Sequence, residues 1–132
     1  MYKGSCLCGA VQYELQGDLG AAVYCHCSRC RKASGSAFAS NAPVSAALFR
    51  LVEGTDQLKA FSTPEGVHRY FCSVCGSPIY SQREQFPDVL RLRLGTLDTV
   101  ISQGPQAHIY VGSKAQWYDI HDDLPQHPER AV

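Results

Sequence analysis

Two glycine-ended cysteine pairs are expected to hold this chain together: Cys6-Leu7-Cys8-Gly9 and Cys72-Ser73-Val74-Cys75-Gly76. In each pair, two cysteines on one short loop place both thiolates within reach of a single ion. The glycine that follows lets the backbone turn so that its N–H groups point at sulfur. Together the pairs supply four thiolates for a closed tetrahedral site joining the first strand to the middle of the chain. Closure over such a long separation should stabilise the fold.

A third cysteine group lies between these pairs: Cys25-His26-Cys27-Ser28-Arg29-Cys30. It supplies three thiolates on one tight segment, and the chain's seven cysteines leave no fourth for it. Three protein ligands with an open fourth position are typical of a catalytic zinc. Three thiolates around Zn²⁺ leave a net charge of about −1. Such a metal is better suited to binding a thiol than to making hydroxide.

Other interpretations of the third group stay open. In one interpretation, His26 or another histidine is a fourth ligand that closes the group into a second structural site. In the other, the three thiols bind no metal and are redox-active. Arg29, Arg31 and Lys32 lie beside it in the sequence. Three roles are open for these cations: they offset the thiolate charge, they receive an anionic substrate, or they are ordinary solvated surface groups. A single cysteine is often only a small buried hydrophobic residue, but the tight clustering argues against that here.

Length and composition indicate one ordinary globular domain. The chain has 132 residues, 45% of them hydrophobic, and its twelve Lys and Arg balance twelve Asp and Glu. This balance gives no reason to expect nucleic-acid binding. No secretory h-region and no run of about 18 apolar residues is present, so we expect a cytoplasmic protein that does not enter a membrane. Thiols stay reduced in that compartment, so the cysteines should not form disulfides.

Short alternating segments separated by glycine and proline predict a mainly β fold with antiparallel strands. In the clearest of them, residues 89–94, three leucines share one face while Val89, Arg91 and Arg93 share the other, which is either solvated or lines a cleft. One helical turn is expected over residues 28–33, ended by Ser34-Gly35. We predict one domain over residues 1–120 and a loose polar tail over 121–132. The expected strands cover residues 10–15 with a hairpin partner at 22–24, then 38–40, 48–52, 58–61, 68–71, 78–81, 89–94 and 107–111.

The order of these motifs resembles the glutathione-dependent formaldehyde-activating enzyme family, also called the CENP-V/GFA domain. The resemblance runs from Gly4 to Trp117 and rests on CxCG, CHCxxCRKxSG, FCxxCGSP and HIYVxSKAxWY, in that order. It implies a small β-tent-like antiparallel fold stapled by zinc, with two Zn²⁺ per chain. The implied structural zinc ligands are Cys6, Cys8, Cys72 and Cys75, and the implied catalytic zinc ligands are Cys25, Cys27 and Cys30.

The resemblance also implies an activity, a carbon–sulfur lyase that joins formaldehyde to glutathione and gives S-(hydroxymethyl)glutathione. Zinc on the third cysteine group would hold the glutathione sulfur as thiolate and present it to the formaldehyde carbon. The expected partner is therefore a small-molecule thiol such as glutathione, with other thiol or aldehyde adducts as further candidates. The alternative from a different class is a non-catalytic, zinc-ribbon-like binding module with two structural metal sites.

His108 and Trp117 lie in the distal motif and are candidates for lining a pocket beside the open metal site. A lone histidine in a strand and a lone tryptophan more often belong to the core or its rim. The sequence has no GxGxxG motif, no phosphate loop and no Ser-His-Asp order that would suggest another chemistry.

Overall fold

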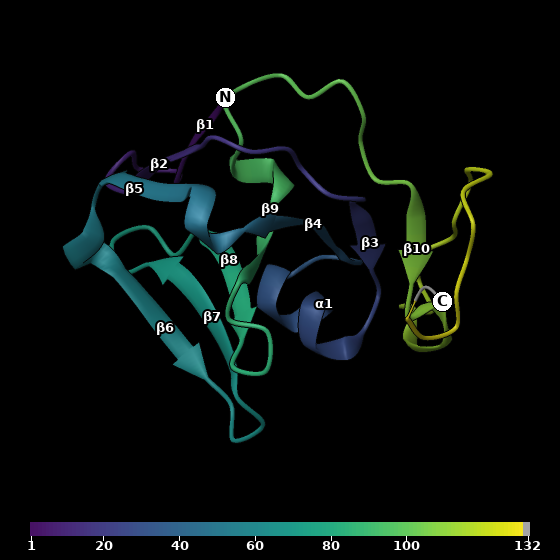
Figure 1. Cartoon of the computed structure of the whole chain (residues 1–132). Helices are drawn as coiled ribbons and strands as arrows, with labels where there is room; N and C mark the ends of the chain where they lie inside the picture. The colour runs from purple at the N-terminus through teal and green to yellow at the C-terminus, as the bar shows by residue number, and fades with distance from the viewer. Residues whose placement is uncertain (131–132) are drawn as a thin grey trace.

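Alternating segments of the chain form ten short strands in the computed structural model, which describes residues 1–130 (Figure 1). A three-stranded sheet has the order β1-β2-β5, and a seven-stranded sheet has the order β10-β3-β4-β9-β8-β7-β6. All neighbouring strands are antiparallel except β10 and β3, which are parallel. The mainly β class is confirmed. The strands are β1 Tyr2–Ser5, β2 Gln12–Leu15, β3 Val23–Cys25, β4 Ala39–Ser45, β5 Phe49–Glu53, β6 Leu58–Ser62, β7 Val67–Cys72, β8 Pro78–Arg83, β9 Val89–Arg93 and β10 Ala107–Ile109.

The predicted hairpin between residues 10–15 and 22–24 is wrong. Strand β2 pairs with β1 and β5, while β3 pairs with β4 and β10. The first cysteine loop is responsible, because Cys6 N donates to Val11 O at 3.0 Å and so folds β1 back onto β2. With β5 on its other edge, β2 has no free edge left for β3.

Pro43 does not break the chain into separate strands as its residue type suggested, but lies inside β4. Its position is opposite Arg91 of β9, just past the last residue pair that β4 makes with β3. The Pro43 carbonyl accepts a hydrogen bond from Gly20 N at 2.8 Å. The nitrogen of Pro43 therefore faces the loop that contains Gly20 and not β9. The missing N–H removes no hydrogen bond from the ladder between β4 and β9, and a strand tolerates proline at such a position.

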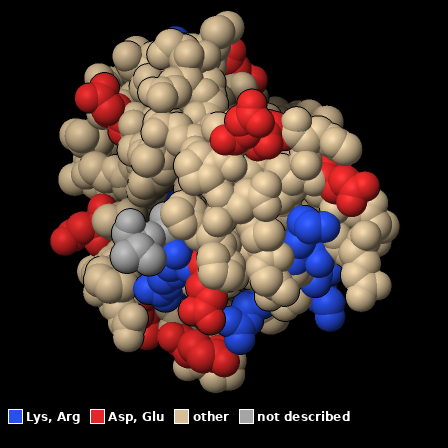
Figure 2. All heavy atoms as spheres, turned by 90° about the vertical axis from the view of Figure 1, so that its right-hand side faces the viewer, with Lys and Arg blue, Asp and Glu red and all other residues tan. Residues whose placement is uncertain are grey.

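The C-terminal segment lies along β10, so the expectation of a loose tail is wrong for most of it. His108 N donates to Pro125 O at 2.8 Å, and His127 N donates to His108 O at 2.9 Å. Strand β10 is a sheet edge with unpaired backbone groups, and this segment pairs them. On the side of the molecule that carries β10, Figure 2 shows basic and acidic side chains interspersed in small groups. Residues 131–132 of the predicted tail lie outside the described residues.

The predicted helical turn is confirmed as α1, Ser28–Ser34. Cys27 caps its start, with its side chain accepting from Cys30 N at 3.3 Å. Gly35 ends it in the left-handed conformation, with φ of 62°. Four short 3₁₀ turns complete the elements: Ala46–Leu48, Thr55–Gln57, Leu94–Thr96 and Val111–Ser113. No helix within residues 1–130 has the length and apolarity to cross a membrane.

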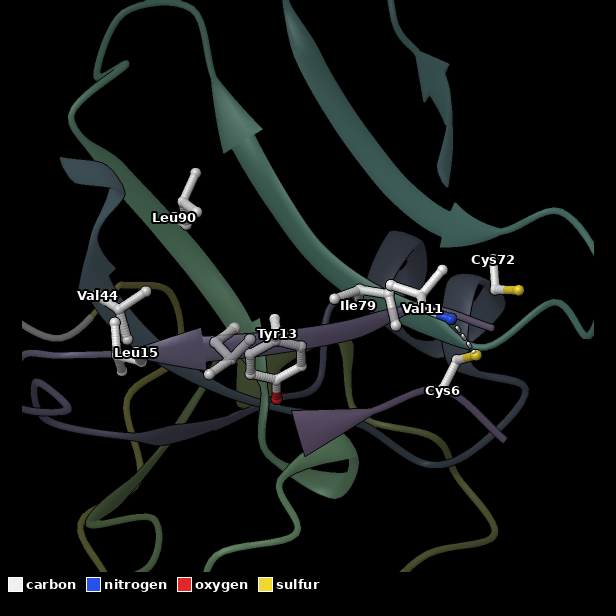
Figure 3. Close-up of a cluster of buried hydrophobic side chains, with 9 residues drawn as sticks. Cys6, Val11, Tyr13, Leu15, Val44, Cys72, Ile79 and Leu90 are labelled. Carbon is white, nitrogen blue, oxygen red and sulfur yellow. Dashed lines mark hydrogen bonds between the residues drawn. The ribbon is translucent and has the colours of Figure 1, made fainter. Parts of the chain in front are cut away.

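The main core lies where the two sheets meet. Tyr13 and Leu15 of β2 pack with Ile79, Leu90 and Leu92 of the large sheet. The same cluster includes two cysteines, and Figure 3 shows both at one end of it: Cys6, which is 5% exposed, and Cys72, which is fully buried. Because side chains alternate along a strand, burying the leucines of β9 turns Arg91 and Arg93 toward the opposite face of the sheet.

Candidate functional site

The first metal candidate is formed by the two cysteine pairs at the end of the core. The ligand sulfurs of Cys6, Cys8, Cys72 and Cys75 all lie within 4.8 Å of one another. Cys8 Sγ is 3.6 Å from Cys6 Sγ and 3.9 Å from Cys72 Sγ. With Zn–S bonds of about 2.3 Å, a tetrahedral site has sulfur–sulfur edges of about 3.8 Å. The group therefore fits an ion of this size and softness.

Local backbone geometry prepares this group for metal. Gly9 and Gly76 take left-handed conformations, with φ of 81° and 80°, which an L-residue adopts only with strain. Val11 N donates to Cys6 Sγ at 3.2 Å, as expected for a thiolate-binding turn. The Ser77 hydroxyl lies 3.3 Å from Cys75 Sγ, and its hydrogen bond lowers the pKa of Cys75 to about 5. A thiol with so low a pKa is already ionised at neutral pH and ready to act as a ligand.

The second metal candidate is the three-cysteine group, built at the junction of β3 and α1. Cys25 ends β3, Cys27 caps the helix and Cys30 lies in its first turn. Their ligand sulfurs lie within 4.8 Å of one another, and within the described chain no other ligand atom joins them by that distance. Hydrogen bonds from the thiols of Cys25 and Cys30 lower the pKa of Cys27 to about 2. Without metal, the group therefore carries its thiolate on Cys27.

The three-cysteine group opens into a cleft of about 690 Å³, whereas the four-cysteine group does not line it. One wall is the seven-stranded sheet, with Val23 and Cys25 of β3, Asn41 and Pro43 of β4, and Ser81 of β8. The start of α1 and the β6–β7 turn, through Thr63 and Glu65, form further walls, and β10 and the residues after it close one end. Figure 1 shows α1 between the β6–β7 hairpin and β10, which places the helix over this face.

The cleft concentrates positive charge in a chain whose formal net charge is zero. Six of the twelve Lys and Arg line it, and Glu65 is the single acidic residue among its lining residues. Within residues 1–130, none of the six forms an ion pair with a carboxylate. An anionic substrate would find its counter-charges here. The six are Arg29, Arg69, Arg83, Arg91, Arg93 and Arg130.

The sequence identified part of this charge. Arg91 and Arg93 line the cleft. The face of β9 that was expected to be either solvated or part of a cleft is therefore part of a cleft. Of the three cations beside the third cysteine group, Arg29 lines the cleft, and Arg31 and Lys32 do not. Sequence analysis missed Arg69, Arg83 and Arg130. The only signal for Arg69 and Arg83 was their place on or next to two ordinary strands, and Arg130 lies in the segment that was predicted to be a loose tail.

His26 takes no part in the second metal candidate, because among the described residues no histidine nitrogen joins the three sulfurs and the His26 ring packs beside Phe38 and His108 instead. Its ring is fully buried, and Nε2 lies 2.8 Å from His108 Nδ1. His108 Nε2 lies 2.9 Å from Asp122 Oδ2 in the C-terminal segment. Burial lowers the pKa of His26 to about 4, so this ring is neutral at physiological pH. The interpretation in which His26 closes the cysteine group therefore has no support.

The two other candidates from the distal motif do not line the cleft. His108 is 1% exposed and packs beside His26 and Tyr24, and Trp117 is 73% exposed on the surface. The same motif does reach the cleft through Ile109, Tyr110 and Ser113. Tyr110 has a left-handed φ of 56°, which ends β10 before the predicted residue 111 and starts the turn that carries Ser113.

These features define a class of protein: a small two-sheet domain with two cysteine groups that could bind metal ions, one of them opening into a cationic cleft. A family model described as "Glutathione-dependent formaldehyde-activating enzyme" (GFA) matches residues 1–113. The chain belongs to this family, as its motif order led us to expect.

One curated relative carries the same family name, and one solved structure shares the fold. A protein of Halomonas elongata named "Putative glutathione-dependent formaldehyde-activating enzyme" is 27% identical over 128 residues, covering 91% of this chain and 81% of its own length. A crystal structure of a Rhodobacter sphaeroides protein superposes with a TM-score of 0.63 at 28% identity. That likeness covers 78% of this chain and 97% of the other.

Proposed function

We propose that this protein is a cytoplasmic, zinc-dependent carbon–sulfur lyase that joins formaldehyde to glutathione to give S-(hydroxymethyl)glutathione. The observation that carries the proposal is the three-cysteine group with no fourth protein ligand among the described residues, at the edge of a cleft lined by six arginines. Glutathione offers what such a site can use, since it carries one thiol and two carboxylates. The family assignment supports the same substrates.

We assign one zinc to each cysteine group. Cys6, Cys8, Cys72 and Cys75 would hold a structural zinc, because they lie at the end of the core and join distant parts of the chain. Cys25, Cys27 and Cys30 would hold the catalytic zinc, which when bound supplies a Lewis acid that keeps the substrate sulfur as a thiolate.

The residues of the cleft position the substrates and stabilise charge. In the reaction, the sulfur lone pair of glutathione forms the new C–S bond with the formaldehyde carbon. The electron pair of the C=O bond moves to oxygen, which takes up the proton that the thiol gave up. Arg93 lies in the wall beside the cysteines, and burial lowers its pKa to about 10, so it stays charged at neutral pH. Fixed cations at such a place favour the negative charge that develops on oxygen.

Exchange NMR of a glutathione and formaldehyde mixture tests this function directly. Zinc-loaded protein should accelerate the exchange between free and hydroxymethylated glutathione above the uncatalysed rate measured alongside. Cys27→Ser should abolish the acceleration, and Arg50→Gln, which lies outside the cleft, should retain it. No acceleration by the wild-type protein would refute the proposal. If added thiol also left the metal ligands unchanged, the non-catalytic binding module would take its place.

A further inference from the structure

Four of the cleft arginines lie on one face of three neighbouring strands. Arg69 of β7 is opposite Ser81 of β8, which is opposite Arg91 of β9, so these three side chains form a row across the sheet. Arg83 and Arg93 stand two residues further along β8 and β9, and therefore project from the same face. All four residues line the cleft. The register of the sheet thus gathers residues that are far apart in sequence.

This arginine cluster, Arg69, Arg83, Arg91 and Arg93, lacks partners for its charge. Among the described residues no carboxylate pairs with it, and Arg69 Nη1 and Arg83 Nε are buried without any hydrogen-bond acceptor. Like charges at neighbouring positions of a sheet destabilise it, and buried unsatisfied donors add a further cost. A bound anion would remove both penalties.

One member of the arginine cluster is held rigidly in place. Arg93 is 8% exposed, and its Nη1 donates to Asn41 Oδ1 at 2.7 Å and to Arg91 O at 3.2 Å. Asn41 lies directly opposite it on β4. Both of these partners are neutral acceptors, so they orient the guanidinium without neutralising it. A cation fixed in this way is preorganised for a ligand and loses little entropy when one binds.

The spacing between the arginine cluster and the three-cysteine group suits a short peptide. Cys25 projects from the same sheet, and the order β3-β4-β9 places the arginines of β9 two strands away. At about 4.8 Å per strand, this separation is about 10 Å, and β8 and β7 lie further out. An extended tripeptide spans about 10 Å as well. A thiol near the cysteines and a carboxylate at the arginines of β9 can therefore belong to one molecule of that length.

We propose that the arginine cluster is an anion site for two carboxylates of the substrate, so that the enzyme selects peptide-sized dicarboxylate thiols over thiols with one carboxylate or none. The thiol in this statement rests on the proposed function, whereas the anion site does not. Guanidinium groups bind carboxylates through paired, charge-assisted hydrogen bonds, which a cluster of four can supply to two such groups.

The test uses S-methylglutathione, whose blocked sulfur cannot react, and its dimethyl ester, which lacks both carboxylates. Isothermal titration with the full-length, zinc-loaded protein should show binding of the first compound, weakening as salt increases, and at least about 10-fold weaker binding of the second. Arg91→Gln and Arg83→Gln should each weaken binding of S-methylglutathione by about 10-fold or more. Arg50→Gln, a cation of β5 outside the cleft, should bind as the wild type does.

Thermal unfolding separates an anion site from a merely structural role. Without ligand, Arg91→Gln and Arg83→Gln should melt at or above the wild-type temperature, because repulsion is relieved, while the ligand-induced rise in Tm shrinks. Equal binding of the two compounds, or variants that melt lower and bind S-methylglutathione unchanged, would overturn the proposal. Catalysed exchange without carboxylate selectivity would refute the anion site alone. Selective binding without catalysis would refute only the proposed function.

Discussion

Residue by residue, the two cysteine groups differ most in what surrounds them. Cys72 is fully buried against the core, whereas Cys27 is half-buried at the edge of the cleft and caps a helix of seven residues. Loss of one ligand should therefore have different consequences in the two groups. A change in the first affects packing between the sheets, and a change in the second affects only a local turn.

Serine substitutions of these two cysteines should separate the two roles. We expect two zinc ions per chain in the wild type and one in Cys27→Ser, with the variant's free energy of unfolding lowered by less than about 2 kcal/mol. Cys72→Ser should lose at least about 3 kcal/mol or become insoluble, because it removes a buried ligand from a site on which folding depends. Elemental analysis of protein purified without added metal, together with thermal unfolding, measures both effects.

The exposed neighbour Ser73 provides the matched control for these measurements, and Ser73→Ala should keep both metals and the wild-type stability. One zinc in both wild type and Cys27→Ser would show that the three-cysteine group is not a stable metal site. The interpretation as redox-active thiols would then replace it. Unchanged melting and metal content in Cys72→Ser would remove the structural assignment.

Among the elements, β10 lies at the edge of the seven-stranded sheet, and the C-terminal segment pairs with its outer side. This strand of three residues has β3 on one side and the C-terminal segment on the other. The polar, proline-rich sequence of that segment predicted a loose tail, because nothing local in it favours a strand. Its order comes instead from the unpaired backbone of β10 and from the contact of Asp122 with His108. Such long-range causes leave no trace in sequence periodicity.

A double-mutant cycle on Asp122 and His108 should measure this attachment. Asp122→Asn is expected to lower the free energy of unfolding, because the hydrogen bond to the buried His108 ring is weakened. In a His108→Phe background the same change should have almost no effect, since the bond is already lost. Urea unfolding of the four proteins gives the coupling energy. Asp123→Asn, at the exposed neighbouring position, should behave as wild type, and additive effects of the two changes would refute the coupling.

At the scale of the whole molecule, the sequence predicted the parts better than their arrangement. Cysteine spacing predicted the two cysteine groups that the fold gathers, and alternation on β9 identified Arg91 and Arg93 as facing a shared surface. Strand order was beyond such reasoning, as the wrong hairpin between residues 10–15 and 22–24 shows. Arg69 and Arg83 escaped notice for the same reason, because only the register of β7, β8 and β9 brings them beside Arg91. Local patterns specify faces, and tertiary pairing decides which faces meet.

This uneven distribution of charge gives the whole molecule a salt dependence that its zero net charge would not suggest. Six arginines line one cleft without carboxylate partners among residues 1–130, so repulsion between them should destabilise the ligand-free protein at low ionic strength. Raising sodium chloride from about 0.01 M to about 0.15 M shortens the screening length from about 30 Å to about 8 Å. We expect Tm to rise by about 2–5 °C over this range.

Differential scanning calorimetry of the zinc-loaded protein checks this expectation, and the double variant Arg83→Gln/Arg91→Gln supplies the comparison. Most of the rise should disappear in that variant, because two of the four charges on the sheet face are gone, whereas Arg50→Gln should keep it. Arg50 pairs with Glu14 at the surface, and screening an exposed pair of this kind changes stability little and with the opposite sign. A Tm that stays level or falls with salt in the wild type would mean that the arginine charges are already balanced within the folded chain. The cleft would then have no unneutralised positive charge for an anion to balance.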